Sequence, residues 1–189
     1  MTLPTLIKRT IWIASLVYSP FQLFSSSNVI QAFSSTAILQ PMVLNLSDTV
    51  ITVFISPECP ICQKYTRRLN GINEEFSGEN FNIVGVVSGN YYTQQDVARY
   101  KLRYGVKYDL IIDTSYTTKE KWNASTTPEV ILSIGDSIYY RGMIDNWFYA
   151  VGRSSNKTTK HFLINAIKSL KNNRPIKIVE TKPIGCFIE

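Results

Sequence analysis

Short apolar runs and a helical repeat follow one another in the first part of the chain. Residues 50–55 are β-branched and apolar, a pattern typical of a strand buried on both faces of a parallel sheet. Apolar residues then recur at spacings of four, three and four, which places them on one face of a helix: Tyr65, Leu69, Ile72 and Phe76. Residues 81–87 form a second apolar run. The order strand, helix, strand predicts a right-handed crossover unit with two parallel strands.

A second helix is predicted after this unit. Thr93 and Asp96 have the spacing of a helix-capping box, so the helix is expected to begin there and to end at Gly105. Residues 110–112 form a short apolar run that predicts a strand. A polar helical turn is expected next, over residues 117–122.

The last third of the chain begins with a predicted hairpin. Two apolar strands, residues 129–134 and 137–141, are joined by a tight turn at Gly135-Asp136. Residues 145–157 are polar and aromatic, which predicts a loop. A final helix is expected to start near Thr158 or Thr159, with an apolar stripe at Phe162, Leu163, Ala166, Ile167 and Leu170. The tail after Pro175 is expected to be extended.

The N-terminal segment has the layout of an export signal. Lys8 and Arg9 precede a mostly apolar run over residues 11–24, which is followed by a small, polar stretch. The run is shorter than the roughly 20 residues that a bilayer span needs. We therefore predict a signal peptide or N-terminal membrane anchor at residues 1–32 and a single domain at residues 33–189. The protein is then expected in the periplasm or another extracytoplasmic compartment, and an uncleaved segment would tether it to the membrane.

Composition agrees with one globular domain and gives no sign of nucleic-acid binding. Apolar residues make up 44% of the chain and charged residues 18%. The 20 Lys and Arg residues exceed the 14 Asp and Glu residues, for a net charge of +6. These basic residues are scattered, without a basic arm or a patch with interleaved aromatics. We therefore interpret the charge as that of a solvated surface and do not predict nucleic acid as a partner.

Two cysteines three residues apart open the first predicted helix, in the sequence Cys59-Pro60-Ile61-Cys62. Free N–H groups and the macrodipole at a helix start stabilise a thiolate, which is the attacking species in disulfide exchange. Cys59 is therefore the predicted nucleophile. Pro60 suits the first helical position, where its missing N–H costs nothing. Cys62, most of a turn deeper, is expected to attack the mixed disulfide and release the product.

Paired thiols also occur in zinc sites and in structural disulfides. A structural zinc site normally needs four ligands, and Cys186 and His161 are the only further Cys and His in the chain, so we predict no metal site. A disulfide across so short a loop would stabilise little. Two thiolates would also suit Cu(I), a soft ion, which leaves a copper-handling protein as an alternative.

The order strand, Ser-Pro-Glu-Cys-Pro-Ile-Cys, helix, strand resembles the thioredoxin-like superfamily. Thr127-Pro128 before a strand is similar to the cis-proline of that fold, which lies against the CxxC and helps to hold an incoming peptide. The strand and helix within residues 93–122 resemble the insertion of the redoxin branch, which includes peroxiredoxins and exported disulfide reductases. The resemblance covers about residues 45–189. It implies a thioredoxin-like three-layer α/β fold, with a central mixed sheet flanked by helices and a redoxin-type strand–helix insertion before the cis-proline.

The C-terminal tail adds to this resemblance. Residues 127–130, 140–145 and 181–186 are similar to segments of redoxin-domain proteins of bacterial envelopes. In such proteins the second CxxC position is often not Cys, while a Gly-Cys tail is present. The resemblance thus implies that the tail folds back and lets Cys186 pair with Cys59 or Cys62. An inert thiol at a strand edge is the alternative.

Residues near the motif depart from the thioredoxin pattern. Glu58 stands where Trp is common, and its carboxylate opposes thiolate formation unless it points to solvent. Val53 replaces a buried Asp, so the usual proton acceptor for Cys62 is missing. Peroxiredoxins bind peroxide with a Thr or Ser hydroxyl, and Ser56 fits that position. A thiol peroxidase using Cys59 is therefore the alternative enzyme.

From these features we predict a thiol–disulfide oxidoreductase that acts on envelope protein disulfides. Cys59 and Cys62 would be catalytic, and Thr127 and Pro128 would bind the substrate. Three further residues are candidates for accessory roles: Ser56, Pro60 and Cys186. The predicted partners are protein disulfides or dithiols, and no cofactor is expected. The alternatives are a thiol peroxidase, a Cu(I)-handling protein and a non-enzymatic scaffold.

Overall fold

The computed structural model describes residues 49–76 and 78–189. The predicted signal peptide or anchor at residues 1–32 lies outside this range, so it stays a prediction together with the boundary at residue 33. Among the described residues, no helix is both long and apolar enough to cross a bilayer.

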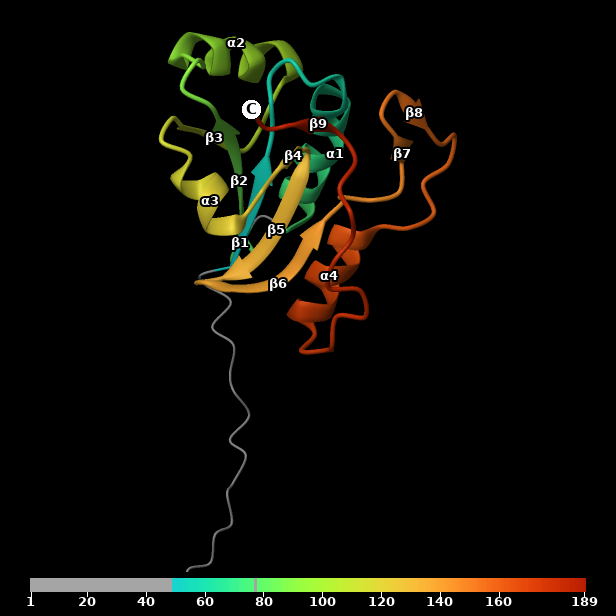
Figure 1. The fold of residues 1–189 in the computed structure, drawn as a ribbon. Helices are drawn as coiled ribbons and strands as arrows, with labels where there is room; N and C mark the ends of the chain where they lie inside the picture. The colour runs from blue at the N-terminus through green and yellow to red at the C-terminus, as the bar shows by residue number, and fades with distance from the viewer. Residues whose placement is uncertain (1–48, 77) are drawn as a thin grey trace, which may run out of the picture. The chain divides into compact units, whose positions relative to one another are not determined.

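A five-stranded mixed sheet forms the centre of the domain, in the order β3-β2-β1-β5-β6 (Figure 1). Its strands are β1 (Thr49–Phe54), β2 (Phe81–Ser88), β3 (Asp109–Asp113), β5 (Glu129–Ile134) and β6 (Ser137–Gly142). β1, β2 and β3 are parallel, whereas β5 runs antiparallel to both β1 and β6. The predicted parallel pair and the predicted hairpin are both confirmed.

Helix α1 (Pro60–Phe76) connects β1 to β2 and completes the predicted crossover unit. The four apolar residues at helical spacing are all buried, each at most 4% exposed: Tyr65, Leu69, Ile72 and Phe76. This stripe packs into the main hydrophobic core together with alternate residues of β1, namely Ile51 and Val53. Packing of this face fixes α1 on the sheet, and therefore fixes the position of its first turn beyond the end of β1.

The redoxin-type insertion is confirmed between β2 and Pro128. Helix α2 (Gln94–Tyr104) begins with the predicted capping box of Thr93 and Asp96 and ends at Gly105. β3 follows, and then the short helix α3 (Thr117–Trp122). α2 contributes to the same core as α1, whereas Trp122 of α3 packs on the other face of the sheet, with Phe54 of β1. Helices therefore flank the sheet, as the resemblance implies.

Two details of the region after β6 differ from the sequence prediction. Part of the predicted loop forms a small hairpin, β7 (Phe148–Ala150) with β8 (Arg153–Ser154). Helix α4 (Phe162–Lys171) starts later than predicted, and exposed His161 precedes it without a side-chain capping bond. The reason is a long-range contact: Asn146 Oδ1 accepts hydrogen bonds from the backbone N–H groups of residues 159 and 160, at 3.0 and 2.8 Å. These residues are thereby held against the loop instead of in a helix.

The C-terminal tail returns across the domain. It first runs beside β6, where the backbone of Arg141 bonds both Val179 O and Thr181 N, each at 3.0 Å. Gly142 permits this approach, because a Cβ atom built there would lie 2.0 Å from Thr181 O and the residue has φ 120°. The tail ends in β9 (Cys186–Phe187), which pairs antiparallel with the two-residue strand β4 (Thr126–Thr127). Figure 1 shows β9 lying beside β4 near the start of α1.

Candidate active site

The CxxC segment lies at the start of α1, as predicted. Cys59 directly precedes the helix, and its carbonyl accepts a hydrogen bond from Gln63 N at 3.1 Å. Pro60 is the first helical residue and is exposed. The two thiols are buried, with Cys59 2% exposed and Cys62 0% exposed. A reactive sulfur at a helix start is thus shielded from bulk water.

The surroundings of Cys59 stabilise its thiolate. The pKa of Cys59 is lowered to about 5, and the main cause is a hydrogen bond from the Cys62 thiol. Hydrogen bonds from the Cys186 thiol and the Cys62 backbone lower it further, whereas burial opposes the shift. Burial raises the pKa of Cys62, and the neighbouring Cys59 sulfur adds to the rise. The two thiols therefore differ: the pKa of Cys59 favours the thiolate at neutral pH, whereas Cys62 keeps its proton.

Thr127 and Pro128 lie beside Cys59, although they are almost 70 residues away in sequence. Their peptide bond is cis, as the resemblance implies, and both residues are buried. The Cys59 Sγ lies 3.4 Å from the carbonyl oxygen of Thr127. Residues at the start of α1 and in β4 thus form one site, in which a backbone edge lies next to the Cys59 sulfur.

Cys186 also reaches this site. It pairs with Thr127 across the β4–β9 ladder, and its Sγ lies 2.9 Å from the Sγ of Cys59. All three cysteines are free thiols. Partial burial and the neighbouring Cys59 raise the pKa of Cys186 to about 11. The tail does fold back onto Cys59, and it places a protonated thiol against the Cys59 sulfur.

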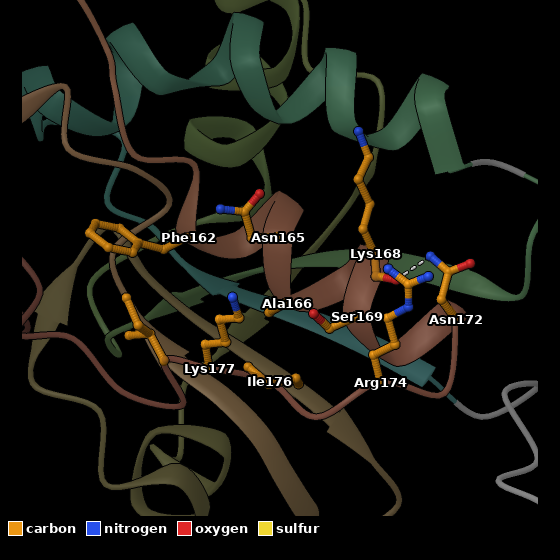
Figure 2. A pocket seen from close by; sticks show the side chains of 10 residues that line it. Phe162, Asn165, Ala166, Lys168, Ser169, Asn172, Arg174, Ile176 and Lys177 are labelled. Atoms are coloured by element: carbon orange, nitrogen blue, oxygen red, sulfur yellow. Dashed lines mark hydrogen bonds between the residues drawn. The ribbon is translucent and has the colours of Figure 1, made fainter.

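A pocket of about 290 Å³ opens over these residues. Cys59, Thr127 and Cys186 line it, together with Ser56, Glu58 and Tyr92. A larger pocket of about 390 Å³ lies between α4 and residues 172–178 (Figure 2). Its described lining residues include Lys168, Arg174 and Lys177 but no cysteine. Cys59 and Cys186 therefore both line the smaller pocket, which is the candidate site.

Tyr92 is a site residue that the sequence analysis missed. Its hydroxyl donates a hydrogen bond to Glu58 Oε2 at 2.6 Å and lies 3.0 Å from Ser56 Oγ, which in turn lies 3.2 Å from Glu58 Oε2. Burial and the bond to Glu58 raise the pKa of Tyr92. Glu58 is exposed, and its carboxylate is bonded to Tyr92 in the pocket that Cys59 also lines. No local pattern marks Tyr92, because the contact depends on the loop after β2.

Asp145 is a second residue whose role the sequence did not reveal. It is 4% exposed and accepts hydrogen bonds from Tyr65 Oη at 2.7 Å and from the backbone N–H of Trp147 at 2.8 Å. It also forms an ion pair with Arg68. These contacts tie the segment after β6 to α1. Asp145 thus supports the helix that carries the two cysteines and does not itself reach the sulfur atoms.

The mixed sheet, the crossover unit and a CxxC beside a cis-proline define a thioredoxin-like protein of the redoxin type. The chain belongs to the AhpC/TSA family, whose model matches residues 42–166. Membership of this family supports a thiol-redox function.

Comparison with solved structures agrees on the fold. A hypothetical protein from Sinorhizobium meliloti 1021 is similar with a TM-score of 0.64 and 21% identity, over 76% of this chain and 81% of that one. An uncharacterized conserved protein from Geobacillus kaustophilus is similar with a TM-score of 0.62 and 18% identity, over 76% and 77%. Among curated proteins, none matches the sequence significantly. At these identities the two structures extend the fold assignment and add nothing about function.

The stabilised thiolate leads to a prediction about pH. We expect alkylation of Cys59 by iodoacetamide to rise with pH around a midpoint near 5, because the rate follows the thiolate fraction and the pKa is about 5. A free cysteine, with a pKa of about 8.5, has well under ~1% thiolate at pH 6. Mass spectrometry of the Cys59 peptide measures the profile. The midpoint is the better readout, because a low pKa also lowers intrinsic nucleophilicity.

The matched control is Cys186→Ser, in which a hydroxyl replaces one thiol donor at the Cys59 sulfur. The profile of Cys62 serves as an internal reference, since its pKa is raised and it should stay unreactive over the same range. A Cys59 midpoint near 8.5 would contradict the described environment.

Proposed function

We propose that this protein is an exported thiol–disulfide oxidoreductase with Cys59 as its nucleophile. The observation that carries the proposal is the environment of the Cys59 sulfur, which is stabilised as a thiolate and lies 3.4 Å from the cis-proline strand. A dithiol in this position needs no cofactor, because the two thiols themselves carry the two electrons of exchange.

The proposed cycle uses the unequal thiols of Cys59 and Cys62. The Cys59 thiolate attacks one sulfur of a substrate disulfide, so that a mixed disulfide forms and one substrate thiolate leaves. Cys62 then gives its proton to the substrate thiolate that has just left and attacks Cys59, which releases the second substrate thiolate and leaves a Cys59–Cys62 disulfide. The substrate gains two electrons and the protein loses two; the reverse sequence oxidises a substrate dithiol.

The proposed substrates are disulfides or dithiols of other exported proteins. Backbone groups of Thr127, beside the buried Pro128, form the edge to which an extended peptide would pair. The export signal predicted at residues 1–32 would deliver the protein to a compartment in which disulfides persist. Whether that segment is cleaved or remains as a membrane tether does not change the chemistry.

Trapping the mixed disulfide tests this function. The double variant Cys62→Ser/Cys186→Ser keeps the nucleophile and removes both thiols that could resolve the intermediate. After reaction with insulin, a protein with accessible disulfides, we expect mass spectrometry to show an insulin chain attached to Cys59. The matched triple variant, which adds Cys59→Ser, should carry none.

The same experiment with hydrogen peroxide in place of insulin tests the alternative function, a thiol peroxidase. In a thiol peroxidase, Cys59 would be oxidised rapidly by peroxide and would react poorly with insulin. The Ser56 hydroxyl, which a peroxidase would need, is bonded to Glu58 and Tyr92. Rapid peroxide consumption that depends on Cys59, without any insulin adduct, would overturn the proposal in favour of the peroxidase.

A further inference from the structure

The backbone edge beside the cis-proline is occupied by the protein's own C-terminal strand. β9 pairs antiparallel with β4, with Thr126 opposite Phe187 and Thr127 opposite Cys186. The ladder continues with a hydrogen bond from Ile188 N to Ser125 O at 3.0 Å. An extended peptide that docked on Thr127 would need the same backbone groups. Such a peptide and β9 therefore cannot occupy the edge together.

Cys186 takes the position of a substrate sulfur in this arrangement. Its Sγ lies 2.9 Å from the Sγ of Cys59, compared with about 2.05 Å in a disulfide. The two atoms are thus within hydrogen-bonding distance and need only a short approach to form a bond. Since β9 carries Cys186 in register with Thr127, the contact follows from strand pairing and not from a free chain end.

The tail approaches the backbone of β4 closely at Gly185, the residue before β9. A Cβ atom built on Gly185 would lie 1.8 Å from the carbonyl oxygen of Thr127. Any other residue type would push the tail away from β4 or distort the cis-proline strand. Further upstream, the bonds of Val179 and Thr181 to Arg141 hold the tail to β6. Together these contacts deliver Cys186 to the active site.

We infer that residues 185–189 are a built-in strand that occupies the peptide-docking edge and that Cys186 closes a reversible disulfide with Cys59. This inference rests on the proposed function and adds a regulation to it. While the disulfide is closed, β9 excludes protein substrates. Small disulfides, which do not need the backbone edge, still reach Cys59 through the pocket when the thiols are reduced.

The closing step balances with a small disulfide such as oxidised glutathione. The Cys59 thiolate attacks it, forms a Cys59–glutathione disulfide and releases one glutathione thiolate. That thiolate accepts the proton of Cys186, and the Cys186 thiolate then attacks the Cys59 sulfur and expels the second glutathione thiolate. Two protein thiols are oxidised to the Cys59–Cys186 disulfide, and one glutathione disulfide is reduced to two thiols. A dithiol reductant reverses the step and frees β9.

The covalent part is tested with Cys62→Ser, which leaves Cys59 and Cys186 as the reactive thiols. After treatment with oxidised glutathione, we expect peptide mapping to show a Cys59–Cys186 disulfide and little remaining glutathione adduct. The double variant Cys62→Ser/Cys186→Ser should keep the adduct on Cys59. A lasting adduct in the single variant would overturn the inference while leaving the proposed function intact. Failure of the double variant to form any adduct would instead count against the proposed function.

The docking part is tested with Gly185→Ala, which retains all three cysteines and displaces the tail. The displaced tail should lose one to two net backbone hydrogen bonds between β4 and β9. We therefore expect the ratio of the exchange rate with insulin to the exchange rate with oxidised glutathione to rise roughly tenfold. The matched control is Gly71→Ala in α1, where a new Cβ meets nothing within 4 Å. Formation of the Cys59–Cys186 disulfide should slow in Gly185→Ala only. An insulin-to-glutathione ratio equal to that of Gly71→Ala would overturn the inference.

Discussion

Replacing Cys59 by serine is expected to lower the rate of disulfide exchange by at least roughly a thousandfold, because the nucleophile of the proposed cycle is lost. A serine hydroxyl is not ionised at neutral pH, and the hydrogen bonds that stabilise the Cys59 thiolate would have no anion to act on. The rate is measured as insulin reduction by the reduced protein. Oxidised glutathione as a second substrate shows whether the loss is independent of substrate size.

Cys62→Ser is the matched control for this prediction. It also replaces a buried sulfur by oxygen at the start of α1, yet it leaves the attacking thiolate in place. We expect it to form the mixed disulfide in a single turnover, which Cys186 then resolves in place of Cys62, whereas Cys59→Ser should not form it at all. Exchange in Cys59→Ser above about a tenth of the wild-type rate would show that another thiol begins the reaction.

A large loss of stability is expected from Arg141→Met. Glu129 directly follows the cis-proline and is 2% exposed, and its carboxylate accepts a hydrogen bond from Arg141 Nη2 at 2.6 Å. Removing the guanidinium leaves a buried carboxylate without its partner, which costs about 3–5 kcal/mol in comparable pairs. Because the Arg141 side chain is 23% exposed, we expect a value near the lower end, about 3 kcal/mol. Urea unfolding of the reduced protein measures it.

The double variant Glu129→Gln/Arg141→Met separates the charge from the packing. It removes the stranded carboxylate while keeping side chains of similar size, so most of the lost stability should return. Arg141 holds the tail through backbone groups, which both variants retain. A double variant as unstable as Arg141→Met would show that packing of the arginine, and not the buried charge, accounts for the loss.

Local sequence patterns predicted most of the fold because burial repeats at fixed spacings. The apolar run of β1, the stripe of α1 and the capping box of Thr93 each lie within one element, and each is confirmed. The start of α4 was predicted too early because Asn146, on a distant loop, holds the backbone of residues 159 and 160. A pattern within one segment cannot predict a hydrogen bond to a residue outside that segment.

The same distinction applies to the candidate site. Cys59 and Cys62 were visible from their spacing and from the helix that follows them, and Thr127-Pro128 from a family resemblance. The sequence does not predict the contact of Tyr92 with Glu58 or of Asp145 with Tyr65, because these partners are 34 and 80 residues away along the chain. Neither contact is marked by a recognisable sequence motif. Only folding brings Asp145 to α1 and Tyr92 to the residues just before α1.

The bonds between the tail and β6 have a consequence for how copies of the protein meet. β6 is an end strand of the sheet, and an uncovered end strand can pair with the same strand of another molecule. Residues 179–181 cover it by bonding the backbone N–H and carbonyl of Arg141. A chain shortened before Val179 would therefore present β6 to its neighbours and be prone to self-association. We therefore expect residues 179–181 to block pairing between molecules at β6, which is a different role from that of the tail's last residues beside Cys59.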